Sequence, residues 1–157
     1  MREPPDPGDG PVPADRSMPG HGSVPDPTRA PERSPFEYAI VRVIPRVERG
    51  EAFNAGIVLM CRARRFLGAR VELDEALLVA MAHDCDSEIV RAHLAAIEGI
   101  AAGDPGAGPI AALSAPERFH WLVSPSSTII APSAVHTGLT ADPAATLDHL
   151  FRTLVRR

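Results

Sequence analysis

The chain has 157 residues, 45% of them hydrophobic, and a formal net charge of −4 at pH 7. This length and composition predict one domain with a core of ordinary size. The negative charge argues against a generic nucleic-acid binder, since such domains usually carry a strong positive excess. No stretch approaches the ~20 apolar residues of a membrane helix, and the N-terminus lacks the pattern of a signal peptide. We therefore expect a cytoplasmic protein that binds no membrane.

The first 35 residues differ in composition from the rest of the chain. They hold ten of the 17 prolines and four of the 12 glycines, with few large apolar side chains. Such a segment cannot bury enough surface to offset the entropy of ordering it. We expect residues 1–35 to be a disordered tail and residues 36–157 to form a single domain. A start of translation further downstream is an alternative interpretation of the tail.

Three strands and then two helices are expected in the next part of the chain. Residues 36–44, 53–61 and 66–73 are rich in β-branched and apolar side chains and are separated by short charged turns, which is typical of antiparallel neighbours. A short helix is expected from residue 73 to about residue 82. In the longer helix that follows, apolar residues recur at helical spacing after Asp84 or Asp86, either of which can cap it.

The last third of the chain predicts two more strands and a helix. Residues 117–123 and 128–130 are expected to be strands, with Trp121 in the core. The final helix is the clearest element, because Asp142 can cap it, Pro143 suits its first position, and an apolar stripe follows. This order of elements predicts an α+β fold, with a mostly antiparallel sheet and helices packed on one face.

Two runs of the sequence resemble a known family. The first consists of Val41–Pro45 and Glu48–Leu59, and the second is Ser133–Pro143. Both resemble domain of unknown function 3037 (DUF3037), a family of uncharacterised bacterial proteins, and the resemblance covers residues 36–156. It implies the fold but no established activity. It also implies an association with HipA-like kinase proteins, beside which members are often encoded, and such an association is not a mechanism.

Arginines are concentrated around the first predicted turn. Seven arginines and two glutamates lie between residues 42 and 70, whereas residues 72–104 contain eight acidic residues and one arginine. Arg42, Arg46 and Arg49 can converge at one end of the first two strands, a geometry suited to phosphate or carboxylate. The alternative is a salt bridge within the turn, to Glu48 or Glu51.

Asn54 and His136 complete the candidate binding residues. Asn54 follows the turn, where an asparagine can also act as a cap. His136 lies near Ser133, but the sequence has no G-x-S-x-G elbow and no third triad member, which favours a structural role. Cys61 and Cys85 lack the paired spacing of a zinc site, so we expect free thiols, no metal and no cofactor.

Three functions remain open at this point. The preferred one is a protein-interaction or regulatory partner, possibly of a HipA-like kinase, as the resemblance implies. The second is a binder of nucleic acid or nucleotide phosphate through the arginine-rich hairpins. The third is an enzyme that holds a small anionic substrate among Arg42, Arg49, Asn54 and His136. The sequence contains no nucleotide-binding loop and no catalytic signature, which favours the first function.

Overall fold

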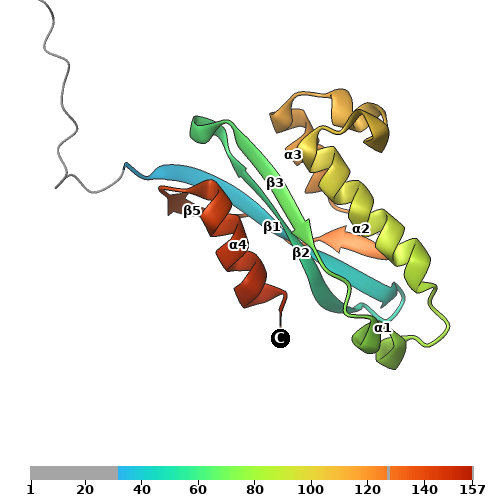
Figure 1. Cartoon of the computed structure of the whole chain (residues 1–157). Helices are drawn as coiled ribbons and strands as arrows, with labels where there is room; N and C mark the ends of the chain where they lie inside the picture. The colour runs from blue at the N-terminus through green and yellow to red at the C-terminus, as the bar shows by residue number, and fades with distance from the viewer. Residues whose placement is uncertain (1–31, 127, 157) are drawn as a thin grey trace, which may run out of the picture. The chain divides into compact units, whose positions relative to one another are not determined.

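The computed structural model describes residues 32–126 and 128–156, and Figure 1 shows their arrangement. Most of the tail expected to be disordered, residues 1–31, lies outside the described residues. The first strand begins at Ser34, slightly before the expected start of the domain. Among the described residues, no helix is long and apolar enough to cross a membrane.

A five-stranded antiparallel sheet forms the centre of the domain. β1 (Ser34–Arg46) pairs with β2 (Glu51–Cys61), and β2 pairs with β3 (Phe66–Val71). Along its other side β1 pairs with two short strands, β4 (Ile130–Pro132) and β5 (His136–Thr140). The three long strands expected from the sequence are confirmed, and β5 was not expected.

Four α-helices accompany the sheet: α1 (Glu75–Met81), α2 (Ser87–Ala102), α3 (Ala115–Leu122) and α4 (Pro143–Leu154). Aspartate side chains cap three of them by accepting hydrogen bonds from the first-turn amides, as local sequence predicts. The capping residues are Asp74, Asp86 and Asp142. Three short 3₁₀ turns complete the chain. They are η1 (Arg62–Arg64), η2 (Pro105–Ala107) and η3 (Pro109–Ala112).

Helices cover both faces of the sheet, so the expected α+β class is confirmed but the expectation of helices on one face is wrong (Figure 1). Strand side chains alternate between the faces, and each face of β2 is apolar. On one face, Val58 and Met60 pack with buried side chains of α1, α2 and α3. On the other face, Ile57 and Leu59 pack with α4. Because β2 is apolar on both sides, each side requires its own cover.

The strand expected at residues 117–123 is wrong, because this segment belongs to α3. Its aromatic and apolar residues favour a strand when the window is taken alone. The helix is set by residues just before that window and by its first residue. Ser114 and Glu117 form a reciprocal capping box, and Pro116 lies in the first turn, where a missing N–H costs nothing.

Candidate functional site

Arg42 lies on β1 with its side chain partly buried. Its Nη2 donates to the carbonyl oxygen of Pro132 in β4 at 3.1 Å. Its Nε is buried and has no acceptor within the described residues. The backbone position of Arg42 is opposite Ala131 on one side and Asn54 on the other. Arg42 therefore ties the short strand β4 to the edge of β1.

Arg46 and Arg49 each contact a carboxylate near the β1–β2 turn. Arg46 lies 3.1 Å from Asp84 in the loop between α1 and α2. Arg49 binds Glu51 through two nitrogens at 2.6 and 3.1 Å, which lowers the pKa of the Glu51 carboxyl, with a smaller contribution from Arg46. The structure thus brings Arg46 and Arg49 to one turn, while Arg42 binds elsewhere. Anion binding by these arginines stays a prediction.

Asn54 and His136 have separate structural contacts. Asn54 Nδ2 donates to the carbonyl oxygen of Leu154 at 2.9 Å and so holds the last turn of α4. The His136 ring lies against the Tyr38 ring, with 5.1 Å between centroids. Of the five candidate residues, only Arg42 and Asn54 are paired with each other in the sheet. None of the five lines either of the two cavities described below.

Ser133 forms a β-bulge between β4 and β5. Ser133 N–H donates to the carbonyl oxygen of Ile40 at 2.8 Å, and the Ile40 N–H donates to Ser133 Oγ at 2.9 Å. The hydroxyl itself donates to the carbonyl oxygen of Ala134. Ser133 Oγ thus takes the place of a backbone acceptor where the pairing is interrupted. This is the structural role that the sequence favoured over a nucleophile.

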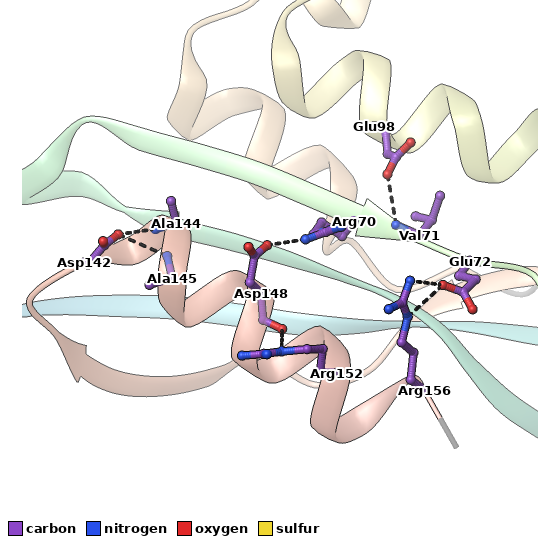
Figure 2. A network of polar contacts seen from close by, with 10 residues as sticks. All are labelled: Arg70, Val71, Glu72, Glu98, Asp142, Ala144, Ala145, Asp148, Arg152 and Arg156. Carbon is purple, nitrogen blue, oxygen red and sulfur yellow. Dashed lines mark hydrogen bonds and ion pairs between the residues drawn. The ribbon is translucent and has the colours of Figure 1, made fainter.

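A second arginine cluster, which the sequence analysis did not single out, joins α4 to β3 (Figure 2). Arg70 pairs with Asp148, and Arg156 pairs with Glu72 at 3.0 Å. The guanidinium carbons of Arg70 and Arg156 lie 5.2 and 5.5 Å from the centre of the Phe151 ring.

The setting of this cluster favours a structural clamp over an anion site. The cavity beside it holds about 250 Å³ and is lined by Arg70, Ala145, Asp148, Phe151, Arg152 and Arg156. Two of the three arginines already face a carboxylate, and the C-terminal end of a helix dipole repels anions. The cluster therefore holds α4 on the sheet.

A larger cavity, with a volume of about 480 Å³, is an apolar groove between α2, α3 and β4. We call it the apolar groove. It is lined mainly by apolar side chains that come from parts of the chain far apart in sequence. They include Ala96, Ile97, Ile100, Trp121, Ile129 and Ile130. This volume is in the range of cavities that bind organic ligands or side chains of another protein.

The lining of the apolar groove carries almost no charge. Among the lining residues that the structure describes, His93 alone is titratable. Its hydroxyl groups are satisfied internally: Ser124 donates to the His120 carbonyl at 2.7 Å, and Thr128 donates to the Ile130 carbonyl at 2.6 Å. Such a surface selects an apolar occupant. Its described lining residues include no polar cluster suited to catalysis.

Trp121 lies at the groove with 50% of its surface exposed, which corrects the expectation that it is a core residue. Phe119 and Leu122 of the same helix occupy the core instead. Because residues 117–123 are helical, side chains two positions apart point in different directions, and Trp121 is directed away from the core. An exposed tryptophan beside an apolar hollow is typical of a binding surface.

The sequence profile described as "Protein of unknown function (DUF3037)" matches residues 38–155. The chain belongs to the DUF3037 family. No curated protein and no solved structure matches it. The expected membership is therefore confirmed over nearly the whole described domain.

The two runs that resemble DUF3037 members contribute to the same sheet, where the second run pairs with the part of β1 that precedes the first. The first forms most of the β1–β2 hairpin, and the second forms the Ser133 bulge, β5 and the start of α4. β1 and β5 pair directly from Ser34↔Thr140 to Tyr38↔His136. Among the described residues, no group of three or more His, Cys, Asp or Glu side chains is placed to hold a metal ion.

Proposed function

We propose that this DUF3037 domain is a protein-interaction domain whose apolar groove receives apolar side chains of a partner polypeptide. The observation that carries the proposal is an uncharged hollow of about 480 Å³ with a half-exposed tryptophan at its side. Burial of apolar surface is the main favourable contribution to protein association, and tryptophan is enriched among the residues that dominate binding energy.

The apolar surface extends beyond the groove, which favours a polypeptide over a small molecule as its occupant. Ile89 is 53% exposed and lies one turn before His93 on the same side of α2. A segment of another protein can cover the hollow, Ile89 and Trp121 together, whereas a ligand that only fills the hollow leaves Ile89 exposed. A HipA-like kinase, the partner implied by family association, is the first partner to test.

The experiment is a calorimetric titration of the domain with a purified HipA-like kinase. Ala96 is an exposed residue that lines the groove, and Ala96→Arg places a charged side chain in it without removing core packing. Ala95→Arg is the matched control, since Ala95 is also exposed and lies on α2 outside the groove. We expect Ala96→Arg to raise Kd at least tenfold, that is by about 1.4 kcal/mol or more, and Ala95→Arg to leave it unchanged.

Two results contradict the proposal. One is equal binding by wild type and Ala96→Arg. The other is a wild-type domain that does not bind the kinase at concentrations up to about 100 µM, weaker than most specific complexes. A small apolar molecule that binds the groove in place of the kinase points instead to a ligand-binding domain.

A further inference from the structure

Side chains cap some of the outward-facing backbone groups at two edges of the sheet, β3 and β4. At the β3 edge, the Val71 N–H donates to the Glu98 carboxylate at 3.0 Å. At the β4 edge, Pro132 has no N–H and its carbonyl accepts from Arg42. The carbonyl of Ile130 accepts from two neighbouring hydroxyl groups. Capped carbonyls and edge prolines are the usual means of preventing edge-to-edge association.

β5 has no such protection within the described residues. Ile40 exchanges hydrogen bonds with Ser133, so its backbone N–H and C=O groups point toward the side of β1 that carries β4 and β5. Because the backbone groups of every second residue in a strand point to the same side, those of Tyr38 point toward β5. The residues of β5 that lie between the hydrogen-bonded pairs, Thr137 and Leu139, therefore direct their N–H and C=O groups away from β1. Neither has a backbone partner on that side within the described part of the chain.

The side chains of this open edge also favour association. Leu139 is 65% exposed, and Val135, directly before β5, is also exposed. Residues 133–141 contain no Asp, Glu, Arg, Lys or Pro. An uncharged edge strand with exposed apolar side chains is a template for a further strand.

We propose that β5 pairs antiparallel with β5 of a second copy of this chain, so that the two sheets become continuous. A two-fold axis at Thr137 places this residue opposite Thr137 of the second copy. It also places Leu139 opposite Val135 of the second copy, which brings two exposed apolar side chains together. On the other face, His136 lies opposite Gly138, a position with no side chain to compete for space.

The second copy is favoured over an unrelated strand because the edge is complementary to itself. In the two-fold pairing, threonine meets threonine and leucine meets valine, and residues 133–141 of neither copy include an acidic or basic side chain. The pairing also closes after two chains, because a two-fold axis uses the same strand of both copies. The contact is independent of the apolar groove.

Sedimentation velocity over a range of about 1 to 300 µM tests the proposal, since specific contacts have Kd values below this limit. We expect a monomer–dimer equilibrium. Leu139→Glu should raise the dimer Kd at least about tenfold, because the charge faces Val135 of the second copy. Val135→Arg combined with Leu139→Glu should restore the dimer, since each glutamate then faces an arginine. Val79→Glu, at a residue 57% exposed on α1, is the matched control and should change nothing.

A disulfide tests the register directly. In a Cys85→Ser background, Thr137→Cys places two cysteines at the two-fold axis, where hydrogen-bonded pairs have Cα atoms about 5.5 Å apart, within disulfide range. We expect covalent dimers on mild oxidation, and none with Val79→Cys. A wild-type chain that is monomeric at every concentration overturns the proposal, as does a dimer that Leu139→Glu leaves intact. A Thr137→Cys chain that does not cross-link overturns the register.

Discussion

Replacing Phe151 with alanine should destabilise the domain by about 3 to 5 kcal/mol, the usual cost of removing a buried phenylalanine. The ring is 2% exposed and packs with Ile57, Leu59 and Leu147 between α4 and the sheet. Two exposed guanidinium groups over the ring contribute about 0.5 to 1 kcal/mol each and are lost with it. We therefore expect the loss of unfolding free energy to lie in the upper part of this range.

The assay is urea unfolding followed by circular dichroism, analysed as a two-state transition. Thr153→Ala is the control, because Thr153 is an exposed residue of the same helix and should change the free energy of unfolding by less than about 0.5 kcal/mol. A loss below about 1 kcal/mol for Phe151→Ala would refute the packing of α4 against β2, since no buried aromatic ring is removed so cheaply.

Three further predictions concern single contacts. Ser133→Ala should cost about 1 to 3 kcal/mol in urea unfolding because it leaves the Ile40 N–H without its acceptor, and Ser133→Thr, which keeps the hydroxyl, should cost less. Gly138→Ala should cost about 1 to 3 kcal/mol because the added Cβ would lie 2.7 Å from ring atoms of Phe36; an equal cost in a Phe36→Ala background would exclude this clash as the cause. The pKa of the Cys85 thiol is raised by burial and then by two neighbouring aspartates, so alkylation followed by mass spectrometry should give a higher midpoint pH than for an unstructured cysteine peptide. A midpoint at or below that of the peptide contradicts this environment.

The helices and strands that could be predicted from the sequence are those whose own residues determine the local conformation. β1 and β2 are long and strongly apolar, and α4 has a cap, a proline at its first position and a continuous stripe. α3 was mistaken for a strand because its cap, Ser114, lies before the apolar window. β5 was missed because it is only five residues long and contains Gly138, and pairing with β1 supplies most of what holds it.

The candidate sites were harder to predict because their contacts join distant parts of the chain. The sequence identified Arg46 as a candidate binding residue but could not show that its side chain pairs with Asp84, which lies beyond the third strand. The apolar groove is built from β1, α2, α3, β4 and the segment before β4, so no local pattern reveals it. The pattern of an amphipathic segment predicts which of its residues are buried. The position of a cavity depends on how several such segments pack together.

The most direct test of the proposed interaction uses Trp121, the only tryptophan of the chain. Incorporation of 5-fluorotryptophan gives a single ¹⁹F resonance at the groove, which can be followed by NMR while unlabelled HipA-like kinase is added. We predict a saturable shift or broadening of this resonance, because the partner covers a ring that is now half exposed. An unchanged resonance at concentrations where calorimetry shows the kinase bound would place the interaction elsewhere on the domain and contradict the proposed role of the groove.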